Sequence, residues 1–184
     1  MKLIETELTG AFLIDPEPTE DPRGLFAKTF SAEAFAAHGL PTRFAEAGLS
    51  HNLQRGTLRG LHFQTPPHGE AKLVRCDRGA IFDVIIDLRA GSPSYGRWLS
   101  AELTAENRHA LLVPKGFAHG FQTLADETQV SYLITEAYVA TAAAGVRWND
   151  GDLGIAWPLE PTAMSERDRT LPLLAAAPVP LVGG

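Results

Sequence analysis

Short strand-like runs separated by turn-forming residues constrain the fold of this chain more than any other feature. Runs rich in Val, Ile, Leu and Phe recur at short intervals, and Gly, Pro, Asn and Asp lie between most of them. We expect nine strands, at residues 11–14, 25–30, 57–63, 72–77, 80–88, 96–103, 109–113, 118–123 and 129–137. Regular short strands with so few helices predict an all-β fold, an antiparallel sandwich or barrel.

One helix is predicted, at residues 32–38, with Ser31 as its N-cap and Gly39 directly after its C-cap. The 184 residues form one domain of ordinary size, 1–184, which is long enough to bury a core. The tail, residues 171–184, is rich in Ala, Pro and Leu, and we expect it to pack on a neighbour or to stay loose.

The composition argues against several classes of partner. The net charge is −6 and Lys and Arg are scattered, so neither a nucleic acid nor an anionic membrane is expected to bind. The single Cys76 rules out an internal disulfide and a four-cysteine metal site. The first residues lack the apolar stretch of a signal peptide, and no run approaches transmembrane length, so we expect a cytoplasmic protein.

His62 lies on a strand in an unusual position. Because strand side chains alternate, the even-numbered residues of 58–64 share one face, and the odd-numbered residues, Arg59 included, share the other. His62 therefore points away from Leu61 and Phe63. If that apolar pair packs outward, His62 faces the interior of the sandwich, where an imidazole is costly unless it has a partner. A satisfied core histidine and a functional base are both open interpretations.

Other polar residues are ambiguous when judged singly. Asp83 and Asp87 alternate with apolar residues in 80–88, and we interpret both as rim or solvent-facing side chains. His119 lies between glycines and aromatics, where a structural role and close approach of a ligand are both open. Tyr132 on a half-buried strand is typical of a core or edge position. The charged run 164–168 is typical of a solvated helix or loop face.

Metal and hydrolase motifs are missing from the sequence. There is no His-x-His pair, and neither His62 nor His119 has a second ligand two to four residues away, so no metal site is predicted. There is also no Gly-x-Ser-x-Gly elbow and no Gly-rich phosphate loop.

Taken together, the ordered motifs resemble the dTDP-4-dehydrorhamnose 3,5-epimerase family over roughly residues 1–170. They are Asp21–Phe26, Gly56–Gln64, Ala71-Lys72, Asp83–Arg89 with Ser92–Gly96, Pro114–Phe121, Tyr132 and Trp148–Asp150. The resemblance implies a cupin-type jelly-roll of antiparallel strands that needs no cofactor and no metal. It also implies a homodimer in which the amino-terminal segment, residues 1–30, is exchanged with the partner.

The resemblance further implies inversion at C3 and C5 of a nucleotide-linked 4-keto-6-deoxy hexose. His62 matches the base, and Asp168 matches the carboxylate that orients it. Lys72 matches the cation at the sugar oxygen, and Tyr132 matches the acid on the opposite face. The implied substrate-binding residues are Arg23, Phe26, Arg59, His119, Tyr138 and Arg167. Ser50 and Asn52 lie where the chain departs from the family, and substitute hydrogen bonds to the substrate and a structural turn are both open for them.

The chain departs from the family pattern at Lys28, in the run 47–52 that begins with Ala47, and at Ala143. Since those positions help to hold the nucleotide and sugar in the family, three hypotheses stay open. The chain is an epimerase acting at both carbons, a single-carbon epimerase or one that uses another nucleotide sugar, or a non-catalytic cupin that only binds a sugar nucleotide.

Overall fold

Two antiparallel sheets dominate the structure, a computed structural model that describes residues 1–178. The strands of this part are β1 (Lys2–Glu5), β2 (Phe12–Asp15), β3 (Thr19–Asp21), β4 (Gly24–Phe26), β5 (Glu46–Asn52), β6 (Leu58–Gln64), β7 (Lys72–Arg78), β8 (Ala80–Asp87), β9 (Trp98–Thr104), β10 (Ala110–Val113), β11 (Phe117–Thr123), β12 (Thr128–Ile134) and β13 (Ala143–Gly145). The helices are α1 (Ala32–Ala37), α2 (Glu166–Thr170) and a 3-10 turn, Leu174–Ala176.

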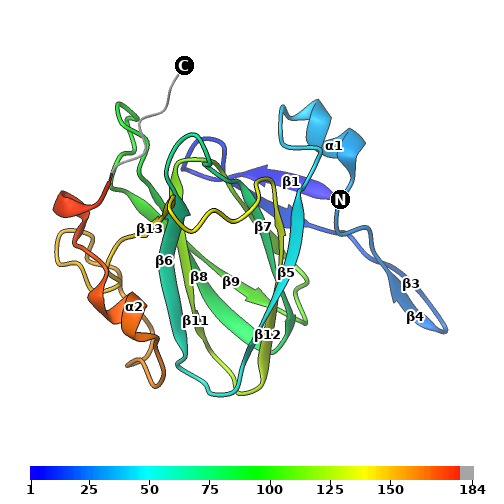
Figure 1. Cartoon of the computed structure of the whole chain (residues 1–184). Helices are drawn as coiled ribbons and strands as arrows, with labels where there is room; N and C mark the ends of the chain where they lie inside the picture. The colour runs from blue at the N-terminus through cyan, green and yellow to red at the C-terminus, as the bar shows by residue number, and fades with distance from the viewer. Residues whose placement is uncertain (179–184) are drawn as a thin grey trace.

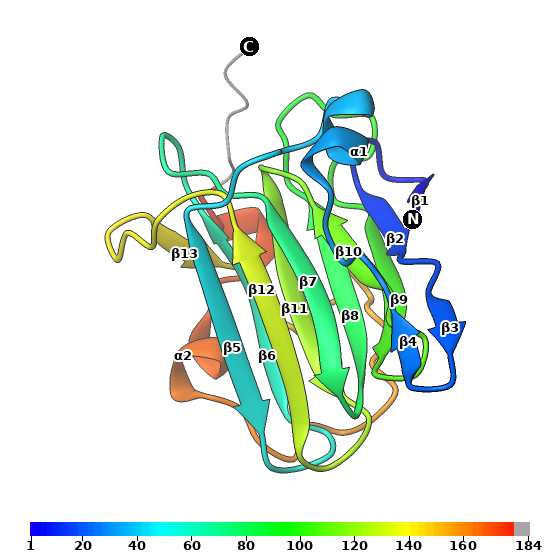
Figure 2. The same ribbon diagram turned by 90° about the vertical axis from the view of Figure 1, so that its right-hand side faces the viewer.

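The six-stranded sheet has the order β1-β2-β10-β7-β12-β5, and the five-stranded sheet has the order β13-β6-β11-β8-β9. Figure 2 shows the two sheets one behind the other, so the predicted all-β antiparallel sandwich is confirmed. A third, two-stranded sheet, the hairpin β3–β4, projects from the body of the molecule (Figure 1).

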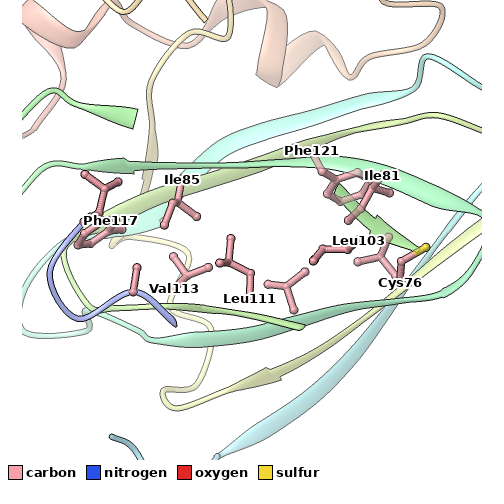
Figure 3. Packing of buried hydrophobic residues seen from close by; sticks show 12 residues of the cluster. Cys76, Ile81, Ile85, Leu103, Leu111, Val113, Phe117 and Phe121 are labelled. Carbon is pink, nitrogen blue, oxygen red and sulfur yellow. The ribbon is translucent and has the colours of Figure 1, made fainter. Parts of the chain in front are cut away.

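The main apolar core lies between the two large sheets (Figure 3). Ile81 and Ile85 of β8 and Phe121 of β11 face Leu111 and the other inward side chains of the six-stranded sheet. The alternation predicted for 80–88 is therefore correct, because the intervening Val84 and Ile86 pack on the opposite face. Burial of these fully enclosed side chains supplies most of the driving force for folding.

A second apolar cluster covers the outer face of the five-stranded sheet. Leu61 and Phe63 of β6 pack there with Val146 and with Leu174 and Ala177 of the carboxyl-terminal segment. His62 consequently faces the interior of the sandwich, as the alternation predicted. Of the predicted tail, residues 171–178 follow this face, and residues 179–184 lie outside the described part of the chain.

Helix α1 covers part of the outer face of the six-stranded sheet, where Phe35 packs with Phe12 and Leu73. Ser31 caps the helix by accepting a hydrogen bond from the Ala34 amide at 3.4 Å. Gly39 follows the C-cap with a positive φ of 68°. The predicted helix and both of its end signals are confirmed.

The alternation of side chains along β6 is interrupted by a β-bulge. His62 pairs with His119, whereas Arg59 pairs with Phe121, so two residues of β6 oppose the single Gly120. His119 and Phe121 share one face of β11, and His62 and Arg59 therefore share one face although they are three residues apart. The prediction that Arg59 points with Leu61 is wrong because this bulge inserts an extra residue.

Gly60 makes the bulge possible. Its φ is +123°, and a Cβ at this position would lie 2.5 Å from the Cα of Gly120. Glycine on both strands thus lets the two backbones approach where the register shifts. The sequence stretch Gly56–Gln64 is accordingly a strand with an irregularity at its centre, beside the polar residues described next.

Candidate active site

A cavity of about 550 Å³ opens between the two sheets at the β6 end of the sandwich. It is lined by Ser50, Thr57, Leu58, Arg59, His62, Lys72, His119, Gly120, Phe121, Tyr132, Ile134, Ala163, Met164, Ser165, Arg167 and Asp168. Residues of β6 and β11 line one wall, and residues of β5, β7 and β12 line the other. The segment that leads into α2 lies beside β6 (Figure 1). Sequence-distant polar residues thus converge on one space.

His62 and Asp168 form a hydrogen-bonded pair at the wall made by β6. Nε2 of His62 lies 2.7 Å from Oδ1 of Asp168, and Oδ2 of Asp168 accepts a hydrogen bond from the Gly60 amide at 3.1 Å. Ser165 caps α2 by accepting from the Asp168 amide at 3.1 Å. The Asp168 side chain is 5% exposed and the His62 side chain 34%, so the carboxylate is enclosed while the imidazole stays accessible.

The surroundings of Asp168 keep it ionised. Burial alone raises the pKa of Asp168, but the hydrogen bond and the charge of His62, with the Gly60 amide, outweigh burial and hold the pKa below its usual 3.8. An ionised Asp168 accepts from Nε2–H, and the lone pair of His62 is then on Nδ1. The pair has the arrangement of an oriented general base. Asp168 belongs to the charged run 164–168, and the interpretation of that run as a solvated face is wrong at this residue.

A second histidine–carboxylate pair lies at the cavity wall, where His119 lines the cavity and Asp83 is buried behind it. Nε2 of His119 is 2.8 Å from Oδ1 of Asp83, and the two side chains are 5% and 0% exposed. Oδ2 of Asp83 is buried and has no hydrogen-bond partner among the residues that the structure describes. Burial raises the pKa of Asp83 despite the opposing charges of His119 and Lys72.

Sequence reasoning missed Asp83 as a site residue. The interpretation of Asp83 and Asp87 as rim or solvent-facing is wrong, since both are fully buried. The signal was available in the strand itself, because Asp83 alternates in phase with Ile81 and Ile85, which face the core. Asp87 is a different case: it accepts hydrogen bonds from Arg89, Ser92 and Ser94 and closes the loop that follows β8.

Tyr132 projects into the cavity from β12, on the wall opposite His62. Its ring meets that of His119 edge-on, with centroids 6.3 Å apart and an interplanar angle of 76°. Burial raises the pKa of Tyr132 well above its usual 10.0, and the negative charge of Asp83 adds to this effect. The phenol therefore holds its proton at neutral pH and is equipped to donate it.

Cationic groups surround this acid–base set. Lys72, Arg59 and Arg167 all line the cavity. Arg59 is oriented by a residue outside the cavity, because its Nε donates to Oδ1 of Asn52 at 2.7 Å. Asn52 itself is buried and donates to the Thr128 carbonyl at 3.2 Å, so it supports Arg59 and does not line the cavity. Such a set of cations suits an anionic, phosphate-bearing ligand.

The remaining predicted residues lie elsewhere. Tyr138 is 62% exposed and lines a smaller cavity of about 180 Å³ next to the first. Arg23 and Phe26 are on the projecting hairpin, where Arg23 Nε donates to Asp21 at 3.1 Å and Phe26 is 71% exposed.

Eight of the predicted site residues line the main cavity: His62, Tyr132, Asp168, Lys72, Arg59, His119, Ser50 and Arg167.

The described part of the chain lacks both a cluster of metal ligands and a membrane-spanning helix. Within residues 1–178, no three His, Cys, Asp or Glu side chains gather in a way that could hold a metal ion. None of the helices described is long and apolar enough to cross a membrane.

Comparison with known proteins identifies the group to which these features belong. A family model for dTDP-4-dehydrorhamnose 3,5-epimerase matches residues 5–176. The chain belongs to this family. It is 46% identical to the dTDP-4-dehydrorhamnose 3,5-epimerase of Methanothermobacter thermautotrophicus over 97% of both chains. It is also 42% identical to a dTDP-4-dehydrorhamnose 3-epimerase of Streptomyces niveus, over 96% of this chain and 86% of that protein.

A crystal structure of the family member from Bacillus anthracis, with TDP and PPi bound, superposes with a TM-score of 0.91. It is 44% identical, and the match covers 94% of this chain and 98% of that one. The expected cupin-type sandwich is therefore confirmed, and this member of the epimerase family is an isomerase that acts on carbohydrates.

Proposed function

We propose that this epimerase inverts both C3 and C5 of dTDP-4-dehydro-6-deoxyglucose, giving dTDP-4-dehydrorhamnose. The observation that carries the proposal is the placement of an oriented base and a protonated acid on facing walls of one cavity. His62, bonded to Asp168 at 2.7 Å, comes from the five-stranded sheet, and Tyr132 comes from the six-stranded sheet. Inversion at carbon needs removal of a proton from one face and return of a proton to the other.

The chemistry follows from the acidity of the substrate. C3 and C5 are both α to the C4 ketone, so Nδ1 of His62 takes the proton and the C–H electron pair passes into an enolate. The negative charge develops on O4, where Lys72 is the cation proposed to stabilise it. The Tyr132 hydroxyl then gives its proton to the same carbon from the opposite face. Exchange with water returns His62 to its neutral form and Tyr132 to its protonated form.

The proposed ligand is a thymidine diphosphate sugar. Arg59 and Arg167 supply guanidinium groups for the diphosphate, and a planar guanidinium matches phosphate oxygens well. The TDP bound to the Bacillus anthracis relative supports this ligand class. Lys28, Ala47 and Ala143 are the positions at which a different nucleotide preference would arise.

A single-carbon reaction is the second candidate. It is favoured by the 3-epimerase of Streptomyces niveus, which is 42% identical to this chain. The same base and acid serve either reaction, so the number of inverted carbons depends on how far the sugar turns in the cavity.

Solvent deuterium incorporation separates the candidates. The enzyme is incubated in D2O with dTDP-4-dehydro-6-deoxyglucose, and NMR of the sugar reports each carbon separately. Exchange and inversion at both C3 and C5 is the expected result. Exchange at one carbon only selects the single-carbon epimerase, and preference for a CDP- or GDP-sugar selects another nucleotide. Tight binding without any exchange selects the non-catalytic binding module.

We further propose that the protein is a homodimer in which the projecting hairpin crosses to the partner. Leu25 and Phe26 on the hairpin are 41% and 71% exposed, and Leu49 on the edge strand β5 is 61% exposed, so apolar surface is left uncovered in one copy. Phe26→Asp should shift the sedimentation coefficient to that of a monomer. Leu173→Asp, a matched change at a 45% exposed leucine, should leave the dimer intact, and a dimeric Phe26→Asp protein would refute the exchange.

The cytoplasmic location expected from the sequence stays a prediction.

A further inference from the structure

Lys72 has a carboxylate partner that comes from outside the main cavity. Nζ of Lys72 lies 2.9 Å from Oε1 of Glu70, and the two side chains are only 13% and 10% exposed. Glu70 comes two residues before Lys72, which begins β7 and pairs there with Val113 and Ile134. The ion pair is thus held at the end of a strand that is bonded on both sides, and it is shielded from most of the solvent.

The two cavities meet at Lys72. The main cavity and the smaller one share His62, Lys72, Ile134 and Arg167 as lining residues. Glu70 lines the smaller cavity and does not line the main one. Lys72 therefore stands at the boundary, with Glu70 on the side away from the cavity that holds His119 and Tyr132.

Such an arrangement restricts where the ammonium can go. A lysine side chain has four rotatable bonds and a strongly hydrated head, so an unpaired ammonium samples many positions. A carboxylate at 2.9 Å engages one of its three N–H groups and leaves the others for the main cavity. A mostly buried pair is screened less by salt than an exposed pair, so this restraint persists at physiological ionic strength.

We propose that Glu70 is a positioning residue that holds the Lys72 ammonium at the boundary, aimed at the enolate oxygen of the substrate. The inference rests on the proposed epimerase function and adds to it a residue that does not touch the sugar. Placement of a charge before the reaction is what makes electrostatic stabilisation effective, because no reorganisation is then needed as the enolate forms. Loss of Glu70 should therefore act on the chemical step.

The first test is Glu70→Gln, which keeps the side-chain shape and removes the charge. We expect kcat to fall about tenfold while KM changes less than about twofold, since the lost interaction serves the transition state. The matched control is Glu136→Gln, because Glu136 lines the same smaller cavity and has no ion pair among the described residues. Its kcat should stay within about twofold of the wild type. Equal kcat values for the two variants would overturn the inference.

A double-mutant cycle distinguishes positioning from a general structural effect. If Glu70 acts only through Lys72, then Glu70→Gln should cost nothing further in a Lys72→Met background, and the two losses should not add. Additive losses, or a Glu70→Gln protein whose thermal midpoint falls along with its kcat, would overturn the positioning role. Wild-type deuterium exchange is measured in parallel. Exchange in the wild type with no effect of Glu70→Gln refutes only Glu70, whereas absent wild-type exchange refutes the proposed function and Glu70 together.

Discussion

Nε2 of His119 lies 2.8 Å from Oδ1 of Asp83, and both side chains are buried inside the sandwich. The Asp83 charge also acts on Tyr132, because it adds to the effect of burial in raising the pKa of that phenol. A buried carboxylate thus influences two neighbouring groups of the cavity, one by a hydrogen bond and one through space.

Asp83→Asn should lower kcat about tenfold, because the amide still accepts a hydrogen bond from His119 but no longer carries a charge. In the same variant the pKa of Tyr132 should fall relative to the wild type. Steady-state kinetics and ultraviolet titration of the phenol check the two effects. Asp77→Asn, at a carboxylate outside the cavity, is the control and should leave both quantities unchanged.

Tyr132 itself should titrate far above an ordinary tyrosine. Burial favours the neutral phenol, so subtracting the 295 nm titration of Tyr132→Phe from that of the wild type should show no phenolate signal below about pH 11. A difference curve with a midpoint at pH 10.0, the usual value, would contradict the burial effect.

Tyr132→Phe should also separate proton removal from proton return. His62 and Asp168 are untouched in this variant, so the substrate proton should still exchange with D2O, while inversion should slow by about 10²- to 10⁴-fold. NMR of the recovered sugar measures both, and His62→Asn should abolish the exchange as well. Retained inversion in Tyr132→Phe would assign the returning acid to another residue.

Much of the fold and part of this site could be predicted from the sequence. Strand alternation placed His62 inside the sandwich, and the caps Ser31 and Gly39 located α1. Local patterns failed where long-range pairing decides the structure. The edge strand β5 has no apolar alternation and forms because β12 pairs with it along seven residues.

The predictions for Arg59 and Asp83 were wrong because they, too, depend on contacts between strands that are distant in the sequence. The bulge that turns Arg59 toward the cavity depends on the meeting of Gly60 and Gly120, which are sixty positions apart in the sequence and belong to different strands. The alternation of 80–88 could have placed Asp83 on the inner face of its strand, but its partner His119 is identified only once β8 and β11 are paired.

Asp168→Asn should reduce kcat by about 10²- to 10⁴-fold, since the amide cannot stabilise the imidazolium of His62.

The free energy of unfolding should depend on pH through Asp168 as well. The folded-state pKa of Asp168 is depressed below 3.8, so ionised Asp168 stabilises the folded wild type above that pH. This contribution is lost as the pH falls through the folded-state pKa.

Urea unfolding of the wild type and of Asp168→Asn across pH 7 to 3 checks this dependence. The difference in the free energy of unfolding should be greatest above about pH 5 and should shrink below 3.8. Glu166→Gln, at an exposed carboxylate of the same helix α2, should show no such trend. A difference that grows toward low pH would mean that the His62 pair does not favour the ionised form.

Gly60→Ala tests the bulge that brings Arg59 and His62 onto one face. A methyl group there would lie 2.5 Å from the Gly120 Cα and 2.9 Å from the His119 carbonyl oxygen, at a φ of +123° that other residues rarely adopt. We expect the free energy of unfolding to fall by about 2–4 kcal/mol, from backbone strain and overpacking together. Gly151→Ala is the matched control, because its Cβ would meet nothing within 4 Å, and its stability should change by less than about 0.5 kcal/mol. Equal urea midpoints for the two variants would show that β6 and β11 can move apart to accept the methyl group at little cost. The position of Arg59 in the cavity would then not require glycine at position 60.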